Sequence, residues 1–86
     1  MADYFDRAGQ PIDEQEFTRK QMSDYRRVAF DEFDGRAGWW VSTVWRGTRP
    51  GLFESMKWPD LTTQRYETEA EALAGHRAMV EEESHG

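Results

Sequence analysis

The chain has 86 residues, no cysteine and a formal net charge of −6. Its length predicts one domain, residues 1–86, with a small core, and the absence of cysteine excludes disulfides and cysteine-based zinc sites. The acidity argues against duplex nucleic acid as a ligand, and no apolar run approaches the roughly 20 residues of a membrane span.

The N-terminal part predicts a small irregular element followed by a short helix. Asp6, Gly9 and Pro11 are turn signals, so residues 1–12 are expected to form an irregular arm or a minimal hairpin. Asp13 is a good N-cap, and Glu16 stands three residues later as in a capping box, which predicts a helix over residues 13–22.

The stretch from Trp39 to Trp45 is the strongest strand signal, because aromatic and β-branched side chains fit a pleated surface. Turn signals at residues 34–38 and 46–51 separate it from strand patterns at 25–33 and 52–58, which predicts a three-stranded antiparallel meander within residues 24–58. Alternation places two sets of side chains on opposite faces of the central strand: Trp39, Val41, Thr43 and Trp45 on one, and Trp40, Ser42 and Val44 on the other.

The last predicted element is a helix over residues 68–83, followed by a tail at 84–86. Thr68 and Glu71 have capping-box spacing, and alanines and glutamates dominate the segment. Gly75 would allow a close approach to the sheet. The order of elements predicts an α+β fold: a two-layer sandwich with a three-stranded antiparallel meander sheet, a short N-terminal helix and a C-terminal helix.

Several segments together resemble a known family; they are Tyr4–Arg7, Trp40–Trp45, Phe53–Met56, Arg65–Tyr66 and Glu71–His76. The chain is similar in them to a family of small uncharacterised proteins of actinobacteriophages and related prophages. The resemblance implies a phage-encoded protein of the host cytoplasm and implies no activity. The loop at residues 46–51 is shorter than the Gly- and Pro-rich loop of that family, so no role is carried over to it.

Glu54 and His76 are the candidates for a small pocket. Alternation predicts that Glu54 lies on the core-facing side of its strand, and His76 lies on the apolar face of the last helix. A buried carboxylate must be paired or protonated, so the simplest interpretation is a bond to Arg46, Arg65 or His76. The functional alternative is a perturbed acid in a pocket. Two distant histidines make no metal site, and no cofactor or catalytic residue is predicted.

The sheet face turned away from the helices is the predicted partner surface, unless the first helix or the N-terminal arm covers it. Aromatic residues and arginine are enriched at interface anchors, and exposed apolar patches mark interaction sites. The residues predicted there are Tyr25, Arg27, Trp40, Val44 and Phe53, with Lys57 at the rim.

The sequence therefore predicts a small non-enzymatic interaction protein, phage-encoded and acting in the host cytoplasm. Its partner would be a second copy of the chain or a host protein. Membrane binding is not predicted, and the net charge argues against nucleic acid. The alternative is an enzyme or small-ligand-binding module with a site around Glu54 and His76.

Overall fold

The computed structural model describes residues 3–33 and 38–85. Most of the turn predicted at residues 34–38 therefore lies outside the described residues. In the part of the chain that is described, neither helix combines the length and the apolar composition needed to cross a membrane.

A four-stranded antiparallel sheet forms the centre of the molecule. Its strands β3 (Arg27–Glu32), β4 (Trp40–Trp45), β5 (Phe53–Trp58) and β6 (Thr62–Tyr66) lie in chain order. The α+β class is confirmed, but the prediction of three strands is wrong. Thr62–Tyr66 is mostly polar and exposed, so it has no hydrophobic period; pairing with β5 makes it an edge strand.

A second, two-stranded sheet precedes the first helix. Its strands are β1 (Tyr4–Phe5) and β2 (Pro11–Ile12), so the minimal hairpin, one of two predicted alternatives, is what forms. The Asp6 carboxylate closes the turn by accepting from the backbone N–H groups of Ala8 and Gln10, at 3.0 and 2.8 Å.

The two helices begin where their capping signals predict. In α1 (Glu14–Gln21) the Asp13 carboxylate accepts from the Glu16 N–H at 2.8 Å. In α2 (Glu69–His85) the Thr68 hydroxyl accepts from the Glu71 N–H, and the Glu71 carboxylate accepts from the Thr68 N–H, both at 3.2 Å. This is a reciprocal capping box. The helix α2 extends past its predicted end at residue 83.

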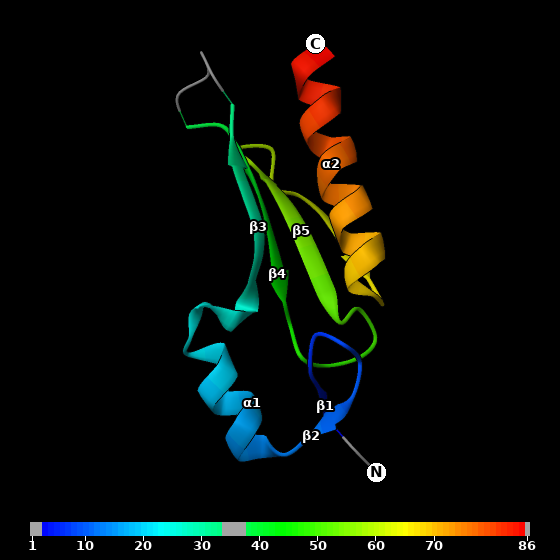
Figure 1. Ribbon diagram of the computed structural model, residues 1–86. Helices are drawn as coiled ribbons and strands as arrows, with labels where there is room; N and C mark the ends of the chain where they lie inside the picture. Colours follow the sequence, from blue (N-terminus) through cyan, green and yellow to red (C-terminus); the bar gives the residue numbers. More distant parts are fainter. Residues whose placement is uncertain (1–2, 34–37, 86) are drawn as a thin grey trace.

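Within residues 3–33 and 38–85, only α2 forms a second layer on the sheet. It contacts β3, β4, β5 and β6 and runs along the sheet, whereas α1 and the β1–β2 hairpin lie together at one end (Figure 1). We call the sheet face under α2 the covered face and the opposite one the open face. Among the described residues, no helix packs across the open face.

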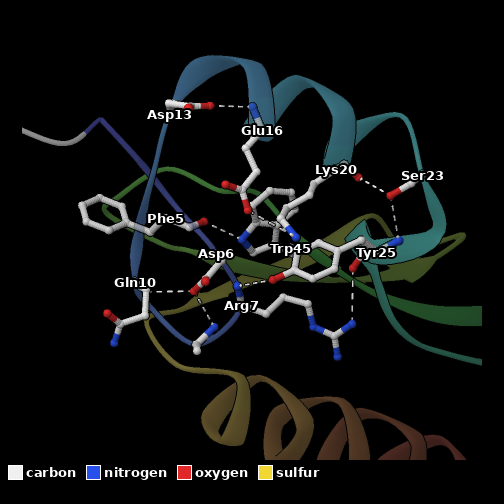
Figure 2. A network of polar contacts seen from close by, with 11 residues as sticks. Phe5, Asp6, Arg7, Gln10, Asp13, Glu16, Lys20, Ser23, Tyr25 and Trp45 are labelled. Atoms are coloured by element: carbon white, nitrogen blue, oxygen red, sulfur yellow. Dashed lines mark hydrogen bonds and ion pairs between the residues drawn. The ribbon is translucent and has the colours of Figure 1, made fainter.

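Trp45 joins the N-terminal elements to the sheet (Figure 2). Its side chain is 1% exposed, and its indole N–H donates to the Phe5 carbonyl at 2.8 Å. The ring lies 5.8 Å from that of Phe17 in α1 and meets the Tyr25 ring edge-on at 5.1 Å. The buried cluster around it contains Leu52, Phe53 and Ala72.

Arg7 adds a polar connection between the hairpin and the start of α2. Its Nε donates to the Glu69 carboxylate at 2.6 Å, and its backbone N–H donates to the Tyr25 hydroxyl at 2.8 Å. The hydrogen bond to Glu69 raises the pKa of the Arg7 guanidinium above its ordinary value, and partial burial opposes this only in part. The guanidinium of Arg7 is charged like that of any arginine, and the bonds of this residue hold three segments together.

Replacing Trp45 with Ala is expected to lower the free energy of unfolding by about 3–5 kcal/mol, because a large buried aromatic side chain and its hydrogen bond are both lost. The matched control is Trp58→Ala, an exposed tryptophan on the same sheet, which is expected to change stability by about 1 kcal/mol or less. Urea denaturation of both variants measures the difference. Equal midpoints for the two variants would contradict the central role of Trp45.

Gly75 lets α2 approach the edge of the sheet closely, as the sequence predicts. A Cβ at this position would overlap the phenol ring of Tyr66, which is the last residue of β6. The absence of a side chain at Gly75 is therefore what admits the Tyr66 ring.

This contact predicts that Gly75→Ala destabilises the protein when Tyr66 is present and stabilises it when Tyr66 is replaced by Ala. Gly75→Ala is expected to lower stability by about 1–3 kcal/mol through overpacking. The same change in a Tyr66→Ala background is expected to raise stability by about 1 kcal/mol, since alanine is the better helix former. Thermal unfolding of the four proteins measures both effects. A change of the same sign in both backgrounds would show that Tyr66 is not the obstacle.

Candidate functional site

A row of aromatic side chains crosses the open face. Phe30 in β3, Trp40 in β4 and Trp58 in β5 follow one another, with ring centroids 5.8 and 5.9 Å apart, and the two indoles are nearly parallel. Phe30 is 48% and Trp58 40% exposed, whereas Trp40 is half-buried between them. The row is therefore an accessible apolar surface on three adjacent strands.

A β-bulge in β3 sets which side chains reach this face. The register with β4 shifts between Arg27 and Ala29, so Arg27 pairs with Val44 and Phe30 pairs with Ser42, both on the open face. Strict alternation would have separated Arg27 from Phe30. A bulge re-aims side chains in this way, and here it places a guanidinium on the same face as the aromatic row.

Two shallow hollows lie beside Trp40, and each combines apolar walls with an arginine. They measure about 240 and 210 Å³. Small-molecule pockets usually measure roughly 300–1,000 Å³, so both hollows are small for a cofactor. Arg26, Trp40, Ser42 and Val44 line both hollows.

The predicted partner residues divide between the two faces. Trp40, Val44 and Arg27 do lie on the open face, and their role in binding stays a prediction. The placement of Phe53 and Lys57 is wrong, because both are buried on the covered face.

The physical reason is the register of β5. It pairs Trp45 with Phe53 and Val41 with Lys57, so both side chains point toward α2. The ammonium of Lys57 lies 3.4 Å from the Asp60 carboxylate, and its apolar stem is buried. Tyr25 is also misplaced, because it lies in a 3₁₀ turn and packs against Trp45.

The predicted pocket between Glu54 and His76 does not form. Glu54 pairs with Val44 on the open face, and its carboxylate bonds to the Arg65 guanidinium at 3.1 Å, which is one of the three partners expected for it. His76 is 5% exposed on the covered face. The sheet separates the two side chains, so they cannot act on one ligand.

His76 instead belongs to a buried polar chain. Its Nε2 donates to the Asp31 carboxylate at 2.7 Å, and its Nδ1 lies 2.7 Å from the Thr43 hydroxyl, which lies 2.5 Å from the Ser55 hydroxyl. In the neutral ring, Ser55 donates to Thr43 and Thr43 donates to His76. Every group therefore has a partner, as buried polar groups require.

The hydrogen-bonded side chains of Asp31, His76 and Thr43 have the residue types of a nucleophilic triad, but the hydroxyl groups are not accessible. Thr43 and Ser55 are fully buried beneath α2, so no substrate carbonyl can reach either hydroxyl, as nucleophilic catalysis requires. Among residues 3–33 and 38–82, no three histidine or acidic side chains are grouped so as to hold a metal ion. The arrangement thus supports a structural role for these polar groups.

Comparison with known proteins adds no relative. No protein-family model matches the chain, and no curated protein or solved structure matches it significantly. The candidate site therefore rests on geometry.

The sequence reasoning missed Phe30, Trp58 and Met56 as residues of the open face. For Trp58 and Met56, the signal that could have placed them was the pairing of β4 with β5. Once Trp45 is set opposite Phe53, the antiparallel register sets Trp40 opposite Trp58 and Ser42 opposite Met56. A shift of one residue sends every side chain of a strand to the other face. The prediction grouped the side chains of β5 correctly but placed Glu54, Met56 and Trp58 on the covered face.

Replacing Thr43 with Val tests the structural role of the polar chain. The change keeps the shape but leaves His76 Nδ1 and the Ser55 hydroxyl without their partner, so stability is expected to fall by about 1–3 kcal/mol. Thr63→Val makes the same change on the exposed strand β6 and is expected to stay within about 0.5 kcal/mol. Chemical denaturation measures both; equal stability of the two variants would contradict the role assigned to Thr43.

Proposed function

We propose that this chain is a non-enzymatic binding protein that recognises a protein partner through the open face of its sheet. The observation that carries the proposal is the aromatic row of Phe30, Trp40 and Trp58. The proposal includes the setting implied by the family resemblance, a phage-encoded protein in the host cytoplasm, and a partner that is a second copy or a host protein.

The cost of leaving these side chains in water supports the proposal. Burying a large apolar side chain contributes roughly 1.5–3 kcal/mol, and a chain of 86 residues builds only a small core. Phe30 and Trp58 nevertheless remain half exposed on one contiguous surface. Contiguous exposed aromatic surface is typical of interaction sites, and tryptophan and arginine dominate binding hot spots.

The alternative function, an enzyme or ligand-binding module around Glu54 and His76, is not supported by the positions of these two residues. Glu54 and His76 lie on opposite faces, and the hydroxyl groups bonded near His76 are buried. The hollows of the open face are lined by aromatic, aliphatic and arginine side chains together with Ser42 and the ion-paired Glu54. These groups suit recognition better than general acid–base or nucleophilic chemistry.

Site-specific photo-crosslinking in cells tests the proposal. A photoreactive phenylalanine at Thr63, which is exposed and paired with Met56 on the open face, is expected to form adducts with a protein partner. The same group at Ala74, on an exposed position of α2, serves as the control and is expected to form few adducts. Adducts at neither position, or equal adducts at both, would contradict a binding role for the open face.

A pair of matched substitutions sharpens this test. Trp58 and Leu73 are both 40% exposed, but Trp58 lies on the open face and Leu73 on α2. Trp58→Ser is expected to reduce adducts at position 63 at least about tenfold, as the loss of a hot-spot aromatic does. Leu73→Ser is expected to leave them unchanged. Circular dichroism of both variants checks that each remains folded.

A further inference from the structure

Arginine side chains line both hollows of the open face. Arg26 lines both hollows beside Trp40, and Arg27 lines one of them. In the described part of the chain neither guanidinium has an ion-pair partner, whereas Arg65 is bonded to Glu54. Two guanidinium groups without an ion pair to any described residue thus lie at one end of an apolar surface, and such groups bind carboxylates or phosphates through charge-assisted hydrogen bonds.

The hollows set the shape of what can bind there. At about 240 and 210 Å³ each is comparable to one large side chain rather than to a drug-sized ligand. They lie side by side, with Trp40, Ser42 and Val44 in both linings. In an extended peptide, alternate side chains point the same way about 6–7 Å apart, so two of them would reach neighbouring hollows.

We propose that the partner presents an extended acidic segment to the open face. This inference rests on the proposed function and names the chemistry of the partner. Two apolar side chains of the segment, from residues separated by one position, occupy the hollows beside Trp40. Carboxylates next to them bind Arg26 and Arg27.

The carboxylates that lie on the open face favour a peptide over a nucleic acid strand. Glu32 pairs with Trp40 and Glu54 pairs with Val44, so both carboxylates lie on the same face as the arginines. A nucleic acid strand carries one negative charge for each nucleotide and would meet these carboxylates as well. The net charge of −6 repels any anion, and this repulsion is larger for a strand with many phosphates than for a peptide with a few carboxylates. A peptide can carry only the carboxylates that meet Arg26 and Arg27, and place uncharged residues beside Glu32 and Glu54.

Selection from a random peptide display library, panned on the immobilised wild-type chain, tests this inference. Selected peptides are expected to be enriched in Asp and Glu beside two apolar residues separated by one position. A selected peptide is then synthesised with a fluorescent label, and again with each acidic residue replaced by its amide. The amide form is expected to bind at least about tenfold more weakly.

Matched variants assign the effect to the two arginines. Arg26→Gln with Arg27→Gln is expected to weaken binding of the acidic peptide at least about tenfold. Arg19→Gln with Arg77→Gln removes the same amount of charge from exposed positions on α1 and α2 and is expected to have little effect. Equal weakening in the two double variants would overturn the inference, because it would reflect net charge alone.

Three further outcomes would also overturn it. They are selection of peptides without acidic enrichment, tighter binding of oligothymidylate than of any selected peptide, and a concentration-dependent dimer that the substitutions at Arg26 and Arg27 abolish. If adducts still form at position 63 in these cases, the proposed function stands and only the acidic segment is wrong. If no adduct forms there, the proposed function itself fails.

Discussion

The rest of the structure depends on the burial of Trp45. Its indole supplies both a large apolar surface and one N–H donor, and the N–H is satisfied by the Phe5 carbonyl. Through the same ring, α1 and the 3₁₀ turn at Asp24–Arg26 dock at the end of the sheet. Short helices are marginal alone, so the contacts with Trp45, together with those of Arg7, make the N-terminal third of the chain part of the fold.

The covered face contains several buried polar groups. Thr43, Ser55 and His76 are buried there, and Asp31 at its edge completes their hydrogen bonds. A network of this kind is costly when partly satisfied and specific when complete. It fixes where α2 lies along the sheet, because His76 must reach Thr43 and Asp31 together.

Filling the covered face in this way leaves the large aromatic residues divided. Trp45 and Phe53 are used in the core, whereas Trp40, Trp58 and Phe30 lie together on the open face. Since α2 alone packs as a second layer, these rings have no layer over them among the described residues. The asymmetry between the faces, rather than any catalytic group, is what the proposed function is built on.

The structural features that depend on residues close together in the chain could be predicted from the sequence. The caps at Asp13 and Thr68, the strand ending at Trp45 and the small residue at Gly75 all lie where the sequence predicts. Each depends on a side chain and a backbone group close in the chain, or on a local period. The α+β class follows from the same local signals.

Only the tertiary structure decided the pairings between distant segments. The polar strand β6 forms by pairing its backbone with β5, and the bulge between Arg27 and Ala29 appears only in the pairing of β3 with β4. The register of β5 decided that Glu54 lies on the open face with Arg65, while Phe53 enters the core. Alternation fixes which side chains share a face, but the choice of face comes from the neighbouring strand, which the local sequence does not contain.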